Sequence, residues 1–119
     1  MKTIIAGSRE IEDYDIVKQA CDECGWTITS VVSGTARGVD SLGEFYAHQM
    51  GIPVHRFPAD WKKFGKAAGH IRNAEMSKNA EALVAIWDGK SAGTRNMIRT
   101  AETKGLRVYV KVVTSAHVR

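Results

Sequence analysis

The sequence predicts an α/β fold in which about five parallel strands form one open sheet with helices on both faces. Two observations lead to this prediction. Short apolar runs rich in β-branched residues alternate with amphipathic segments of about a dozen residues. Glycine-containing polar turns separate the runs from the segments. Strand, helix and next strand at this spacing form parallel units with right-handed crossovers, which is a Rossmann-like arrangement.

The first strand and the first helix are predicted within residues 2–25. Residues 2–6 are a short apolar run that leads into a polar turn. Asp13 can cap the helix that follows, and Gly25 ends it. The inward stripe of this helix is Ile16, Val17, Ala20, Cys21 and Cys24. Because a redox C-x-x-C pair normally lies in the turn that opens a helix, this late pair predicts buried core thiols.

The second and third strands flank a helix that begins near Val39. Residues 28–32 are rich in β-branched residues and are expected to be buried on both faces of the sheet. The helix is expected to turn Leu42, Tyr46 and Met50 toward the sheet and to end at Gly51. Residues 53–57 form the third strand.

Residues 58–69 show no clean periodicity and are predicted to be a long loop. The segment contains Trp61, Phe64 and three lysines. Two interpretations stay open. The loop folds over a bound ligand, or its aromatic residues only anchor a solvated excursion.

The last part of the chain repeats the pattern once more. Residues 70–79 are expected to be helical, and residues 83–87 form the most apolar strand. A second glycine-rich turn at 88–94 opens a helix that Gly105 closes, and residues 106–113 form the fifth strand. The expected organisation is one domain at 1–113 with a tail at 114–119.

Composition restricts the possible function classes. The 119 residues are 44% hydrophobic and 25% charged, which is ordinary for a globular protein and favours neither disorder nor a membrane protein. The first residues lack the apolar core of a signal peptide, so a cytoplasmic location is expected. The net charge of +4 permits an anionic partner. The four histidines have no metal-ligand spacing, and no metal or cofactor is expected.

Three polar turns follow the first, second and fourth strands. In an open parallel sheet these turns meet at the carboxyl edge, where ligands bind. Glycine lets the backbone approach an anion, and the first N–H groups of a helix favour negative charge. The turns therefore predict a phosphate site. The spacing matches neither a P-loop nor a dinucleotide G-x-G-x-x-G motif.

Several runs of the chain carry a family resemblance. They are IAGSR (5–9), SGTARGVD (33–40), FPADW (57–61), GKAAG (65–69), IRN (71–73) with EM (75–76), and WDGKS (87–91) with GT (93–94). Together they cover almost the whole sequence. These runs resemble the SLOG superfamily of nucleotide-binding Rossmann-like domains, specifically its small branch named for YspA and cpYpsA.

Two better-known branches of that superfamily imply different functions. The LOG phosphoribohydrolases cleave the N-glycosidic bond of nucleoside monophosphates with an arginine in an H-x-R-K-A-E-M-like run and a glutamate in a P-G-G-x-G-T-x-x-E turn. Residues 70–76 resemble the first run and place Arg72 at the arginine, whereas Met97 occupies the glutamate position. Because a thioether cannot exchange a proton, Asp40 or Glu44 would have to replace that carboxylate. Whether the chain is an enzyme therefore stays open.

The DprA/Smf branch binds single-stranded DNA and has a similar S-G-x-A-x-G-I-D turn. Single-strand binding would use Trp61, Phe64 and Trp87 as stacking groups beside a basic groove. A nucleic-acid partner is therefore a second alternative. A homodimer is also expected, because relatives of this fold often pair through helices beside the site.

The leading hypothesis is a nucleotide or nucleotide-derived ligand, either a nucleoside monophosphate or an ADP-ribose-like molecule. The catalytic candidates are Arg72, Asp40 and Glu44. The predicted ligand-binding residues are Gly7, Ser8, Arg9, Ser33, Gly34, Thr35, Ala36, Arg37, Gly38, Asp40, Trp61, Arg72, Asn73, Asp88, Gly93 and Thr94.

Overall fold

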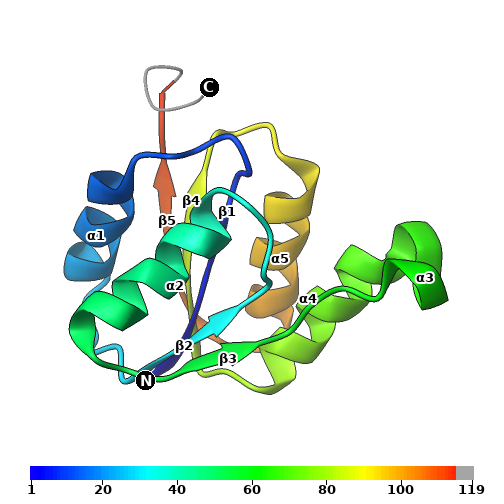
Figure 1. Cartoon of the computed structure of the whole chain (residues 1–119), viewed down its shortest axis with the longest axis horizontal. Coiled ribbons are helices and arrows are strands. Elements are labelled where there is room, and N and C mark those ends of the chain that lie inside the picture. The colour runs from blue at the N-terminus through cyan, green and yellow to red at the C-terminus, as the bar shows by residue number, and fades with distance from the viewer. Residues whose placement is uncertain (115–119) are drawn as a thin grey trace.

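The sheet is entirely parallel, as the sequence predicts (Figure 1). The structure is a computed structural model that describes residues 1–114. Within these residues the strand order is β3-β2-β1-β4-β5, so β1 lies at the centre with β2 on one side and β4 on the other. The strands are β1 (Lys2–Gly7), β2 (Ser30–Ser33), β3 (Val54–Arg56), β4 (Ala82–Trp87) and β5 (Arg107–Val112).

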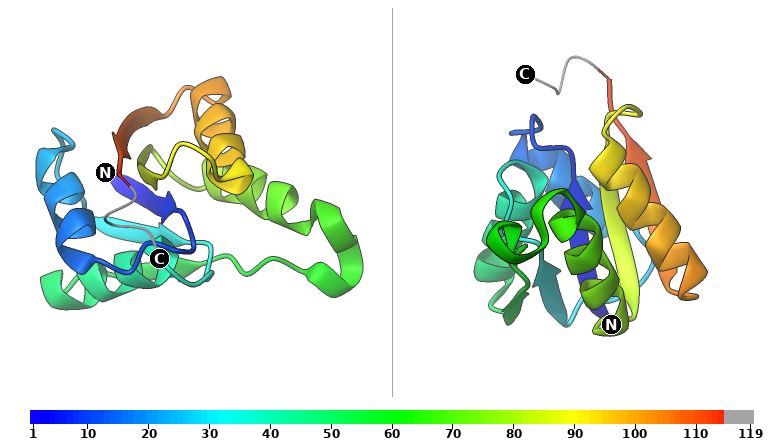
Figure 2. Two further views of the ribbon diagram at one scale, coloured as in Figure 1. Left: turned by 90° about the horizontal axis from the view of Figure 1, so that it is seen from above. Right: turned by 90° about the vertical axis from the view of Figure 1, so that its right-hand side faces the viewer.

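Helices cover both faces of the sheet. They are α1 (Tyr14–Glu23), α2 (Val39–Met50), α3 (Trp61–Phe64), α4 (Ala68–Lys78) and α5 (Ala92–Thr103), with a short 3-10 helix η1 (Gly65–Ala67) between α3 and α4. The first two pack on one face, and α4 and α5 pack on the other (Figures 1 and 2). None of the helices within residues 1–114 combines the length and the apolar character needed to cross a membrane.

Two apolar clusters lie on opposite faces of β1. Ile5 packs in the cluster beneath α1 and α2, whereas its neighbour Ile4 packs in the cluster beneath α4 and α5. Both side chains are completely buried. Successive residues of a strand point to opposite faces, so a central parallel strand with both faces covered is mostly apolar on both sides. Burial of the strands on both faces explains the continuous apolar runs in the sequence.

The first helix begins and packs as predicted. The Asp13 carboxylate accepts a hydrogen bond from the Asp15 N–H at 3.0 Å and caps α1. Cys21 and Cys24 are free thiols buried in the core. Burial raises the pKa of the Cys21 thiol to about 12, so this thiol is protonated at neutral pH and chemically inert. The prediction of core thiols is confirmed.

Two predictions for single segments are wrong. Residues 58–69 are not an irregular loop, because they contain α3, η1 and the start of α4. The Asp60 side chain caps α3 by accepting from the Lys63 N–H at 3.0 Å. Met50 does not face the sheet and is 55% exposed. Residues 48–51 are all exposed, since the last turn of α2 extends beyond the core.

The segment 58–67 projects from the body of the molecule and is here called the arm (Figure 2). It leaves the sheet after β3, turns at α3 and η1, and returns as α4. Trp61 and Phe64 remain 53% and 40% exposed on it. Of the predicted tail at 114–119, all but Thr114 lies outside the described residues.

Candidate functional site

A cavity of about 410 Å³ lies at the carboxyl ends of β1 and β4. The strand order reverses between these two strands, because β1 continues through α1 to β2 on its other side. This first cavity brings together eleven of the predicted ligand-binding residues, namely Gly7, Ser8, Arg9, Ala36, Asp40, Trp61, Arg72, Asn73, Asp88, Gly93 and Thr94.

A second cavity of about 330 Å³ adjoins the first. The two share Arg9, Ala36, Trp61 and Arg72, which therefore form the wall between them. The second cavity also contains three further predicted residues, Gly34, Thr35 and Arg37. Two predicted residues, Ser33 and Gly38, line neither cavity.

Ser33 shapes the turn instead of lining a cavity. Its side chain is completely buried, and its hydroxyl donates to Glu44 Oε2 at 2.6 Å while accepting from the Thr35 N–H at 3.1 Å. Thr35 has a φ of 63°, a left-handed conformation that β-branched residues rarely adopt. The bond to Ser33 holds this strained residue at the mouth of the second cavity.

Gly38 joins the turn after β2 to the turn after β1. Its φ is 75° and its ψ is −128°, a region open essentially to glycine alone. A Cβ atom there would lie 2.5 Å from the Arg9 carbonyl oxygen and 2.6 Å from that of Ser8. The first N–H of α2, from Val39, also donates to the Ser8 carbonyl. The two turns are thus packed backbone against backbone.

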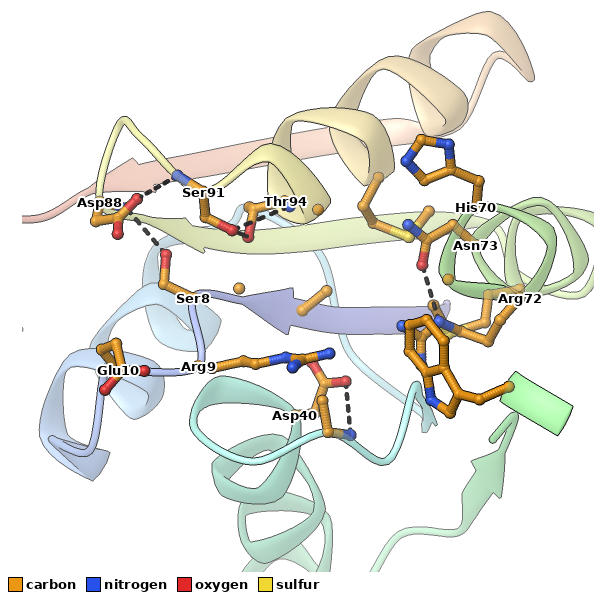
Figure 3. Close-up of a pocket in the computed structure, with 18 of the residues that line it drawn as sticks. Ser8, Arg9, Glu10, Asp40, His70, Arg72, Asn73, Asp88, Ser91 and Thr94 are labelled. Carbon is orange, nitrogen blue, oxygen red and sulfur yellow. Dashed lines mark hydrogen bonds between the residues drawn. The ribbon is translucent and has the colours of Figure 1, made fainter. Parts of the chain in front are cut away.

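Arg72 and Asp40 both approach Gly34 closely, and Figure 3 shows the two side chains on the lining of the first cavity. The Asp40 carboxylate accepts from the Ala36 N–H at 3.1 Å, and Arg72 Nη1 donates to the Gly34 carbonyl oxygen. A Cβ atom on Gly34 would lie 2.7 Å from Asp40 Oδ2 and 2.8 Å from Arg72 Nη1. Glycine at this position leaves room for the close approach of two charged groups, whereas its backbone angles do not call for glycine.

Burial perturbs both charged groups. Desolvation raises the pKa of Asp40 to about 6, and repulsion from Glu44 adds to this rise, against the opposing effects of the Ala36 N–H, Arg72 and Arg9. Burial also lowers the pKa of Arg72; Asp40 opposes this shift, and repulsion from Arg9 adds to it. Within residues 1–114 the Arg9 side chain makes no hydrogen bond or salt bridge. One buried carboxyl group therefore faces two guanidinium groups, here called the arginine pair, and the wall carries excess positive charge.

Two asparagines hold Arg72, one member of the arginine pair. Arg72 Nε donates to Asn73 Oδ1 at 3.0 Å, and Asn73 Nδ2 donates to Asn96 Oδ1 at 2.9 Å. This chain of bonds connects α4 to α5 and fixes the orientation of the guanidinium group. Asn96 was not among the predicted residues, because nothing in the sequence indicates which turn of α5 faces α4.

In the turn after β4, several N–H and hydroxyl groups form hydrogen bonds with side chains of the turn itself. Asp88 Oδ1 accepts from the N–H groups of Lys90 and Ser91, both at 2.8 Å. Burial alone would raise the pKa of Asp88, but these hydrogen bonds lower it. Ser91 caps α5, and the buried Thr94 hydroxyl donates to Ser91 Oγ at 3.1 Å. Asp88 and Thr94 line the first cavity, yet both also build the turn.

Two positions bear on the carboxylate that hydrolysis would need, namely Glu44 and Met97. Glu44 lies outside both cavities, where it accepts from Ser33 and pairs with Arg56 at 2.6 Å. The structure therefore does not bring it to the site. Met97 is 1% exposed and lies where the first cavity meets the core cluster beneath α4 and α5. Asp40 is the catalytic candidate that remains beside Arg72.

Sequence reasoning missed several lining residues of the first cavity, including Glu10, Lys66, His70, Met76 and Ser91. One sequence pattern in α4 indicates further lining residues. Gly69, Arg72, Asn73 and Met76 follow the spacing of a single helix face, and all four line the cavity. Extending the face from Arg72 and Asn73 would have added Met76.

Asp40 makes folding depend on pH in a direction that can be measured. Its folded-state pKa of about 6 lies above its ordinary value of 3.8, so the folded chain binds more protons between these pH values. Ionisation of Asp40 therefore costs stability, fully above pH 6 and not at all below pH 3.8. We expect Asp40→Asn to raise the free energy of unfolding at pH 7 by about 2 to 3 kcal/mol, measured by urea denaturation.

The matched control for this experiment is Asp22→Asn, whose carboxylate forms an exposed pair with Lys18. It should change stability by less than about 0.5 kcal/mol. An Asp40→Asn variant that is no more stable than the parent at pH 7 would contradict the assignment of a destabilised carboxylate.

Comparison with known proteins identifies the family. The family model described as "YspA, cpYpsA-related SLOG family" matches residues 1–64. The chain is also 37% identical over 118 residues to the Gene 61 protein of Mycobacterium phage D29, and the match covers 90% of this chain and 93% of that protein. No solved structure matches significantly. The chain belongs to the YspA, cpYpsA-related SLOG family.

Proposed function

We propose that this protein binds a nucleotide or nucleotide-derived ligand, with the nucleoside in the first cavity and a phosphate against the arginine pair. The observation that carries the proposal is the unbalanced charge at the wall, where Arg9 and Arg72 face the single carboxyl group of Asp40. Such a site favours anions, since charge-assisted hydrogen bonds from guanidinium to phosphate are among the strongest in proteins.

The surrounding elements support the same ligand. The N-termini of α2 and α5 border the first cavity through Asp40 and Gly93, and helix N-termini attract negative charge. Asp88 and Glu10 on the cavity lining can accept hydrogen bonds from ribose hydroxyls. Trp61 gives the cavity an aromatic face for a base.

The experiment is a thermal unfolding series with adenosine, AMP, GMP and ADP-ribose. We expect the phosphate-bearing compounds to raise the melting temperature by about 10 °C at about 100 times their Kd, because they bind only the folded chain. Adenosine should produce a much smaller shift. If no compound shifts the transition while an oligonucleotide binds in a salt-sensitive manner, the nucleic-acid alternative replaces this proposal.

A second candidate function is hydrolysis of the N-glycosidic bond of a nucleoside monophosphate. The observation that favours it is the position of Asp40, buried in the cavity beside Arg72 with a pKa of about 6. A carboxyl group titrating near neutrality can exchange a proton during a reaction. Chromatography of the same AMP and GMP incubations would detect the free base, and its absence would restrict the function to binding.

A further inference from the structure

We infer that the second cavity is a subsite for a further phosphoryl group, so that the preferred ligand carries a diphosphate and not a single phosphate. This inference rests on the proposed function, because it extends the same ligand across the wall formed by the arginine pair. It concerns a part of the crevice that binding of a monophosphate would leave empty.

The charges of the two cavities differ. The first cavity is lined by three acidic residues, Glu10, Asp40 and Asp88, together with basic ones. Among the residues that the structure describes, the second cavity is lined by Arg9, Arg37 and Arg72 and by no acidic residue. A neutral, hydroxyl-bearing nucleoside therefore suits the first cavity, and anionic groups are favoured on the other side of the wall.

The arrangement of the two cavities on either side of the arginine pair determines how the ligand would lie. A phosphate at the arginine pair touches both cavities, because Arg9 and Arg72 line both. The second phosphoryl group of the ligand then enters the second cavity, toward Gly34 and Arg37. At about 330 Å³ this cavity is within the size range of ligand sites.

Arg37 is available for this role at small cost. Its guanidinium group pairs with Glu10 at 2.6 Å, but the two side chains are 72% and 48% exposed. Such a solvent-exposed ion pair contributes little to stability, so Arg37 can leave Glu10 and pair with a phosphate at small cost. An incoming phosphate offers Arg37 two oxygens in the geometry that its guanidinium group matches. Arg37 lines only the second cavity, whereas its partner Glu10 lines the first. The ratio of the ADP and AMP affinities, and not either affinity by itself, therefore reports on the second cavity.

The test compares AMP with ADP by isothermal titration, without divalent metal, in the parent and in Arg37→Gln. We expect ADP to bind the parent at least about tenfold more tightly than AMP, and we expect Arg37→Gln to reduce this ratio to about two. The control is Lys63→Gln, which removes the same charge from the exposed arm and lines neither cavity. It should keep the parent ratio.

Three results would overturn the inference. Equal affinity of the parent for AMP and ADP would show that the second cavity is not used, while the proposed function itself would stand. An unchanged ratio in Arg37→Gln, or the same fall of the ratio in Lys63→Gln, would show that only the general positive field favours ADP. Failure of both nucleotides to bind would instead contradict the proposed function.

Discussion

Gly38→Ala is expected to destabilise the folded chain by about 3 to 5 kcal/mol, the largest effect of any substitution considered. The φ of 75° and ψ of −128° at this position are not accessible to alanine without strain. The new methyl group would also lie 2.5 Å from the Arg9 carbonyl oxygen, and neither backbone segment can move freely. Urea denaturation measures the loss, and a chain that does not fold when expressed counts as the extreme of the same result.

The other end of α2 provides the control. Gly51 also has a positive φ, of 67°, but a Cβ atom there would meet nothing within 4 Å. Gly51→Ala therefore carries only the left-handed backbone cost of about 1 to 2 kcal/mol. Equal losses in the two variants would show that backbone angle, and not the packing of the two turns, sets the role of Gly38.

Arg72→Met is expected to weaken AMP binding by about 100-fold, because a charge-assisted pair in a half-buried site is worth about 2 to 3 kcal/mol. Methionine keeps much of the length and the apolar stem of the side chain while removing the guanidinium group. The bonds of that group to Gly34 and Asn73 are lost with it. Isothermal titration with AMP gives the change in affinity.

The control for overall charge is Arg99→Met, an exposed arginine of α5 that lines neither cavity. It should alter the AMP affinity by less than about threefold at physiological salt, since exposed distant charges are screened. If the Arg72 and Arg99 variants lose the same affinity, Arg72 acts through net charge and has no direct contact with the ligand.

The parallel sheet and the place of the site could both be predicted from local sequence. Continuous apolar runs such as that around Ile4 and Ile5 are what a strand buried on both faces requires. Polar turns that follow parallel strands must meet at one edge, whatever the strand order. The convergence of Ser8, Asp40 and Gly93 on one cavity follows from these two facts.

The details that escaped prediction depend on packing between distant elements. The arm carries a four-residue helix, too short for any periodicity, and only Asp60 as a cap and Gly65 as its end signal it. The run SGTARG does not reveal the different roles of its two glycines. One lies against charged side chains, and the other lies against backbone. Gly34 meets Arg72 from α4, and Gly38 meets Arg9 from the first turn. Those partners lie far away in the chain.

The measurement that tests the central claim most directly is the mapping of AMP binding by amide chemical shifts in ¹⁵N-labelled protein. A nucleotide site at the carboxyl edge predicts saturable shifts at Ser8, Arg9, Ala36 and Gly93, which line the first cavity. It predicts little change at Thr27 and Gly105, which lie at the opposite edge of the sheet. Saturable shifts confined to Lys62 and Lys63, which line neither cavity, or no shift at millimolar AMP, would contradict a nucleotide site at the carboxyl edge.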